Sequence, residues 1–261
     1  MNEKNVDYLK DQLKYLGFGE PIAEKLSAAI QEGKPAFVIQ HEAAFQGVPI
    51  AAQLHFKQSS QSDLYFFNKY EAQLKNEKNL SLDRQATFHI NKGSSITLKE
   101  AFNLLQGRAV NKDLISKEGQ SYNAWVQLDL KTKDAQGQYP VNMYHERYGF
   151  DLEKTLAAHP IKELRDEGGK EMLMKSLQKG NLQSVTVLTE VGQERRYIEA
   201  APQYKSINQY DEQLKPIRNN MDKTIEGNKE VHKSQGLKGD DSEDAGPELK
   251  KNRTRKNGLS V

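Results

Sequence analysis

The sequence predicts an α+β protein made of three divergent repeats of a helix followed by an antiparallel three-stranded meander, plus a disordered C-terminal tail. Three observations carry this prediction. Glycines that end a helix recur at nearly constant spacing, and after each of them the apolar residues change from helical to alternating spacing. Beyond about residue 219, apolar residues almost vanish.

The repeat is defined by two sets of glycines. The helix-ending set lies at separations of 74 and 73 residues: Gly33, Gly107 and Gly180. The hairpin set follows after 14, 12 and 12 residues: Gly47, Gly119 and Gly192. Coincidence is the alternative, because glycine is common after helices and in turns. The agreement of order, spacing and neighbouring residues favours a repeat.

The first predicted unit covers residues 1–95. Apolar residues at helical spacing predict a helix over 5–16, and a second helix runs from Pro21 to about Gly33, after which Pro35 prevents its continuation. Alternating apolar residues then predict strands over four ranges: 36–41, 50–56, 63–70 and 86–90. The last range belongs to an insertion, 76–95, that departs from the repeat.

The second predicted unit covers residues 96–168. Thr97 and Glu100 form a capping box, which starts a helix that ends at about residue 106. Strands are expected over 109–115, 122–130 and 138–144. A second insertion, 149–168, contains two expected short helices, 151–157 and 161–164, on either side of Pro160.

The third predicted unit covers residues 169–217. Its helix begins near Gly169 and ends at Gly180, and its strands are expected over 183–189, 192–201 and 204–210. Residues 218–261 form the tail. One helix with a three-stranded meander buries too little surface to be stable alone. We therefore expect the units to share sheets or to stack their helix faces.

Composition and charge exclude several classes of protein. Residues 1–217 carry 28 basic and 28 acidic residues, and the remainder carries 10 and 8, so the net charge of +2 does not itself indicate a nucleic-acid partner. The absence of cysteine excludes disulfides, thiolate zinc sites and cysteine nucleophiles. There is no signal-peptide pattern or long apolar run, so we expect a cytoplasmic protein without membrane contact; secretion by another route is the alternative.

Motifs for cofactors, metals and catalysis are missing, so no cofactor and no metal site are expected. Gly17-Phe18-Gly19 lacks the third glycine of a dinucleotide fingerprint. The densest group of functional side chains is His145, Glu146 and Arg147, between two tyrosines. This group offers a general acid or base, but a polar loop after a strand is the better explanation.

The only tryptophan, Trp125, is the candidate for partner binding within the ordered body. It lies on the face of its strand opposite the apolar residues, which makes it a candidate exposed aromatic. The competing explanation is that a helix or a neighbouring unit covers that face.

The tail offers a second candidate surface. Five positive charges fall within seven residues: Lys250, Lys251, Arg253, Arg255 and Lys256. Such a cluster binds DNA or another polyanion weakly and in a salt-sensitive way. A solubilising tail is an equal alternative, since the acidic residues from Asp240 to Asp244 partly neutralise the basic cluster.

Four segments resemble a Bacteroidetes family of unknown function: ITLKEAFNLLQGRAVNKDL, EGQSYNAWVQLDL, LQKGNLQSVTVL and YIEAAPQYKSINQYDEQ. The resemblance covers residues 95–215. Members of that family look like cargo of conjugative mobile elements, and related segments are appended to type IA topoisomerases. The resemblance implies a DNA-linked accessory role and transfers no catalytic residue.

The expected function is that of a non-catalytic accessory binding protein of a mobile element, which contacts a protein or nucleic-acid partner. Two alternatives stay open. One is an enzyme of unknown class that uses the loop at residues 145–147, and the other is an immunity-type protein that acts by occlusion.

Overall fold

The computed structural model describes residues 2–75, 83–91 and 93–217. It confirms an α+β protein with antiparallel sheets. The residues up to Ile217 form one compact unit. The predicted disordered tail, with its five-residue basic cluster, lies outside the described residues, as does part of the first predicted insertion. In the described part of the chain, no helix has the length and apolar character needed to cross a membrane.

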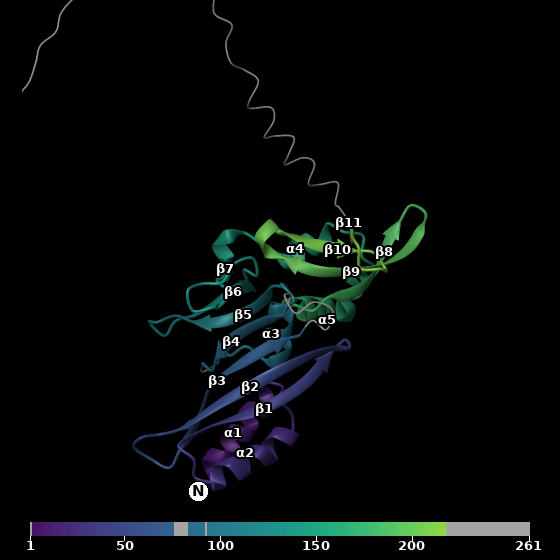
Figure 1. The fold of residues 1–261 in the computed structure, drawn as a ribbon. Coiled ribbons are helices and arrows are strands. Elements are labelled where there is room, and N and C mark those ends of the chain that lie inside the picture. Colours follow the sequence, from purple (N-terminus) through teal and green to yellow (C-terminus); the bar gives the residue numbers. More distant parts are fainter. Residues whose placement is uncertain (1, 76–82, 92, 218–261) are drawn as a thin grey trace, which may run out of the picture. The chain divides into compact units, whose positions relative to one another are not determined.

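Two amphipathic helices open the chain, α1 (Glu3–Tyr15) and α2 (Pro21–Gln31). The side chain of Asn2 caps α1 by accepting a hydrogen bond from the amide of Asn5. Pro21 begins α2, where its fixed φ suits the first helical turn. Each helix buries one apolar stripe against the first sheet, next to which both lie in Figure 1.

The first sheet contains four strands in sequence order: β1 (Ala36–Phe45), β2 (Val48–Gln58), β3 (Tyr65–Leu74) and β4 (Arg84–His89). The alternation predicted for the second strand is confirmed by four buried side chains: Ile50, Ala52, Leu54 and Phe56. β4 comes from the predicted insertion, so this sheet has one strand more than the predicted meander. One face of the sheet is packed, and the other is exposed and mostly polar, with Val38 and Phe66 at its surface.

Helix α3 (Leu98–Leu105) follows, and its predicted capping box is confirmed. The Tyr70 hydroxyl donates a hydrogen bond to the carbonyl oxygen of Ile96 at 2.7 Å, which ties the first sheet to the start of α3. The second sheet is three-stranded: β5 (Val110–Ile115), β6 (Ser121–Leu128) and β7 (Val141–His145). β7 begins three residues later than the sequence predicts, because Pro140 has no amide hydrogen to donate to the ladder.

The second insertion forms its two predicted short helices, α4 (Leu152–Ala157) and the 3₁₀ turn η3 (Lys162–Arg165). The 3₁₀ turn η2 (Glu146–Tyr148) precedes it, where the sequence predicts a polar loop. Helix α5 (Glu167–Gln178) leads to the third sheet, which contains β8 (Gln183–Thr189), β9 (Gly192–Ala201), β10 (Ser206–Tyr210) and β11 (Pro216–Ile217). The 3₁₀ turn η4 (Pro202–Tyr204) takes the start of the predicted third strand, and β11 was not predicted.

Two apolar cores hold these elements together. The first core lies between α1, α2, the first sheet and α3, and it includes Val110, Val126 and Leu128 of the second sheet. The second core lies between Trp125, α4, α5 and the third sheet. The second sheet contributes to both cores, through opposite faces of β6.

The junction between the second and third predicted units is made by buried polar groups. Asn103 is fully buried, and its amide donates a hydrogen bond to the carbonyl oxygen of Lys179 at 2.7 Å. Arg108 donates hydrogen bonds to Asn103 and to the carbonyl oxygen of Gly180. A Cβ at Gly180 would lie 2.8 Å from the carbonyl oxygen of Ala109, so only glycine fits there.

Candidate functional site

Trp125 is buried, with 7% of its surface exposed. The prediction of an exposed aromatic is therefore wrong, and the alternative, that another part of the chain covers this face, is confirmed. Its ring meets that of Phe150 edge to face at a centroid distance of 5.3 Å. The second core encloses it with apolar side chains from α4, α5 and the third sheet. The hypothesis of partner binding thereby loses the exposure on which it rested.

The loop at residues 145–147 lies on the surface, and the side chains of His145, Glu146 and Arg147 are exposed. The flanking rings of Tyr144 and Tyr148 pack edge to face at 5.0 Å. The Tyr148 hydroxyl also donates a hydrogen bond to the carbonyl oxygen of Gln203 at 2.8 Å, which anchors the loop on the third sheet's η4 turn. These contacts fit a polar loop stabilised by its tyrosines.

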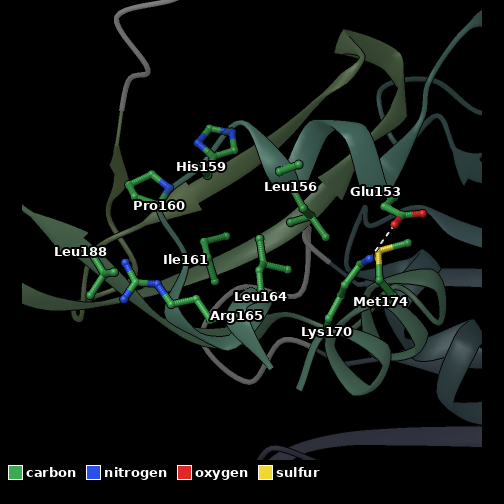
Figure 2. Close-up of a pocket in the computed structure, with 11 residues that line it drawn as sticks. Glu153, Leu156, His159, Pro160, Ile161, Leu164, Arg165, Lys170, Met174 and Leu188 are labelled. Atoms are coloured by element: carbon green, nitrogen blue, oxygen red, sulfur yellow. Dashed lines mark ion pairs between the residues drawn. The ribbon is translucent and has the colours of Figure 1, made fainter. Parts of the chain in front are cut away.

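A concave site lies where the sequence predicts only an insertion. It is a pocket of about 370 Å³, which we call the α4–α5 pocket, and Figure 2 shows the residues that line it. They are Glu153, Leu156, Ala157, His159, Pro160, Ile161, Leu164, Arg165, Lys170, Met174 and Leu188. This volume is at the small end of the range for ligand sites, about 300 to 1,000 Å³.

Local hydrogen bonds hold the elements around the α4–α5 pocket in place. Asp151 caps α4, and Asp166 caps α5 by accepting a hydrogen bond from the amide of Gly169. The Glu163 carboxylate accepts a hydrogen bond from the amide of Thr186 at 2.9 Å, which covers the edge of β8 with η3. The walls of the pocket are therefore braced by the fold itself.

The floor of the pocket is apolar and continuous with the second core. Leu156 and Ile161 belong to that core and are only 1% and 3% exposed, yet both line the pocket. Leu164 and Met174 are half-buried and pack against the same core. The pocket is thus a place where the second core opens to the surface.

Charged groups surround this floor. The Lys170 ammonium forms an ion pair with Glu153 at 2.7 Å, and this hydrogen bond raises the pKa of Lys170. The half-buried His159 has a lowered pKa, because burial and then the positive charge of Arg196 disfavour its protonated form. Arg165 is exposed and has no hydrogen-bond or ion-pair partner among the residues that the structure describes.

A second hollow, of about 330 Å³, has polar walls at the ends of α1, α3 and α5. Its central pair is Lys112 and Glu100, whose Nζ and Oε2 atoms are 3.1 Å apart and whose side chains are 14% and 10% exposed. Glu100 also accepts the amide hydrogen bond of Thr97 in the capping box. Because these groups satisfy one another and fix the start of α3, we interpret this hollow as structural.

The sequence reasoning did not find the α4–α5 pocket. The signal that could have indicated it is the 149–168 insertion, where apolar and basic residues alternate around Pro160 outside the repeated pattern. In the described ranges, no group of three or more His, Asp or Glu side chains is arranged to hold a metal ion. Searches against family models, curated proteins and solved structures give no match to this chain.

Proposed function

We propose that this chain is a non-catalytic accessory binding protein, which recognises a protein partner by accepting an apolar side chain in the α4–α5 pocket. The observation that carries this proposal is the exposed continuation of the second core, where Leu156 and Ile161 are core residues and pocket residues at once. Apolar anchors that fill such pockets contribute most of the binding energy of many protein interfaces.

A preformed pocket suits this role because little conformational freedom is lost on binding. The pocket is built from helices and a strand rather than from a long loop. Its two helices carry N-terminal caps, and the Pro160 carbonyl oxygen and the Glu163 carboxylate accept hydrogen bonds from amides of β8. A partner would therefore meet the site in its binding conformation.

Two methionines of α5 provide a matched test. Met174 lines the pocket, whereas Met172 is 71% exposed on the same helix and lies outside it. Affinity purification with the full chain, followed by reconstitution of any complex from purified components, should give a partner whose binding weakens about tenfold in Met174→Gln. Met172→Gln should bind like the unchanged chain. A reconstituted complex that tolerates Met174→Gln would overturn the proposal.

DNA is the second candidate partner, favoured by the five basic residues between Lys250 and Lys256 and by the resemblance to a family of unknown function whose members look like cargo of mobile elements. The test is a polarisation titration with single- and double-stranded DNA, using the full chain and a version with all five changed to Gln. Binding that weakens with salt and is lost in the neutralised version supports this candidate. Absence of salt-sensitive binding by the full chain removes it.

We also propose that the three cycles of helix and sheet are divergent copies of one unit. The helix-ending glycines have φ values of 69°, 89° and 77°, and the hairpin glycines 77°, 80° and 140°, so all six adopt backbone conformations that favour glycine. In each cycle the strands that follow pair as antiparallel neighbours in sequence order. This interpretation makes the α4–α5 pocket a feature added to the repeat by an insertion.

A further inference from the structure

We infer that the partner of the α4–α5 pocket is an acidic peptide segment, in which an apolar side chain enters the pocket and a neighbouring carboxylate pairs with Arg165. This inference rests on the proposed function, because it names the chemistry of the partner for the same site. It follows from the charges around the pocket, from their placement and from its size.

Positive side chains around the floor outnumber negative ones, and one of the positive side chains has no ion-pair partner among the described residues. Two cations, Arg165 and Lys170, line the pocket against one acidic side chain, Glu153, while the lowered pKa of His159 favours its neutral form. The Glu153 carboxylate is engaged by Lys170 at 2.7 Å. Arg165 thus supplies a guanidinium that no described residue neutralises. The mouth of the pocket is complementary to a negative group.

The position of Arg165 determines on which side of the pocket a negative group of the partner would bind. Figure 2 shows the Glu153–Lys170 pair on one side of Leu164, while the side chain of Arg165 extends on the other side toward Leu188. An apolar group over Leu164 therefore has a free cation on one side only. A carboxylate one or two residues from the anchor would reach it, since neighbouring extended residues are about 3.3 Å apart along a strand.

Arginine is well suited to this contact, because its planar guanidinium donates two parallel hydrogen bonds to one carboxylate. An apolar side chain bound beside it would exclude water and strengthen the interaction. A lysine at the same place in the partner would be repelled by the positive charge of Arg165. The site therefore discriminates against basic segments as well as favouring acidic ones.

The size of the pocket suits the anchor of a protein segment. A volume of about 370 Å³ accommodates one or two large side chains, and the rest of a segment would lie outside it. A peptide compensates by using the surface around the pocket. The anchor provides the apolar contact and Arg165 provides the selection for charge.

The test uses the full chain and fluorescein-labelled peptides that carry one leucine or phenylalanine anchor. Three sets are compared, in which all flanking residues are aspartate (acidic), asparagine (neutral) or lysine (basic). The acidic peptides should bind more tightly than the neutral ones, and the basic ones should bind least. Arg165→Gln should weaken acidic-peptide binding about fivefold without affecting neutral peptides. Arg165→Lys should recover part of the loss, and the exposed Lys154→Gln on α4 serves as a control for a general charge effect.

The outcomes separate this inference from the function on which it depends. Equal binding of all three peptide classes, abolished by Met174→Gln, would keep the pocket as a binding site and overturn the acidic partner. If octanoate binds, loses binding in Arg165→Gln, and none of the peptides binds, the acidic-peptide inference is overturned in favour of a small carboxylate ligand. Equal losses in Arg165→Gln and Lys154→Gln would overturn the specific role of Arg165. A loss confined to Arg165→Gln supports it.

Discussion

The two apolar cores differ in how they end at the surface. The first core is the larger: the largest fully buried side chains of the described residues all belong to it, among them Tyr70 and Phe18, and one of them, Ile50, borders a hollow of about 400 Å³. The second core has fewer members and continues into the α4–α5 pocket through Leu156 and Ile161. We therefore expect the first core to dominate stability, whereas the second core contributes the surface on which the proposed function depends.

Aromatic rings pack against one another inside the first core. Phe18 lies at the turn between α1 and α2, and its ring meets those of Phe67 and Tyr70 edge to face at 6.0 and 5.2 Å. Tyr70 in turn stacks on Phe88 of β4. Each ring fills space that aliphatic side chains would leave partly empty, so this cluster is closely packed.

The largest expected effect is loss of stability when this cluster is truncated. Phe18→Ala should lower the free energy of unfolding by about 4 kcal/mol, because it removes a buried ring and leaves a cavity. The measurement is urea unfolding of the full chain followed by circular dichroism. Phe66→Ala on β3, where the side chain is 51% exposed, should cost less than about 1 kcal/mol. Similar losses in both would mean that the first core is not the main source of stability.

The glycines that end α2 and α5 give the next largest effect. Gly180 has a φ of 77°, and a Cβ there would lie 2.8 Å from the Ala109 carbonyl oxygen and 2.9 Å from Cγ2 of Val110. Gly180→Ala should therefore lower the free energy of unfolding by about 3 kcal/mol, from backbone strain and overpacking together.

Gly33 is the matched position beside the first core. It has a similar φ of 69° but nothing within 4 Å of the added Cβ, so Gly33→Ala should cost only the backbone strain, about 1 kcal/mol. The two changes are measured by the same unfolding experiment. Equal losses would show that the close approach at Gly180 relaxes freely, and that the junction between the second and third sheets is loosely packed.

Much of the fold can be read from local sequence signals. The capping box at Thr97 and the alternation in β2 depend on neighbouring residues, and both are confirmed. Alternation also predicts correctly the side of β6 on which Trp125 lies. It does not predict that Trp125 is buried, because α4 and α5 cover that side and a single sequence does not show which distant elements meet.

The candidate site was harder to predict for the same reason. The pocket combines Leu156 from α4, Met174 from α5 and Leu188 from β8, which are separated by 18 and 14 residues in sequence. Local spacing carries no information about this convergence. The loop at residues 145–147 has the densest group of functional side chains in the sequence, but density in sequence does not create a concave site.

The smallest expected effect concerns histidines beside the two cores. Burial lowers the pKa of His159, helped by Arg196, and burial also lowers the pKa of His41 beside the first core, helped by Lys25. In the unfolded chain both titrate near the ordinary value of 6.5. As the pH falls below 6.5, the unfolded chain binds more protons than the folded one, so the free energy of unfolding decreases.

Substitution of each histidine tests how much it contributes to the decrease of the unfolding free energy at low pH. His159→Gln and His41→Gln should each flatten the curve of unfolding free energy against pH below 6.5, relative to the unchanged chain. Above that pH, each variant should differ from the unchanged chain by a constant amount, because the histidines are neutral in both states. His159 borders the open pocket, so an acidic peptide bound there should raise its pKa and reduce its contribution to the slope, whereas that of His41 should not change. A peptide that altered both contributions equally would show that the two cores do not act separately.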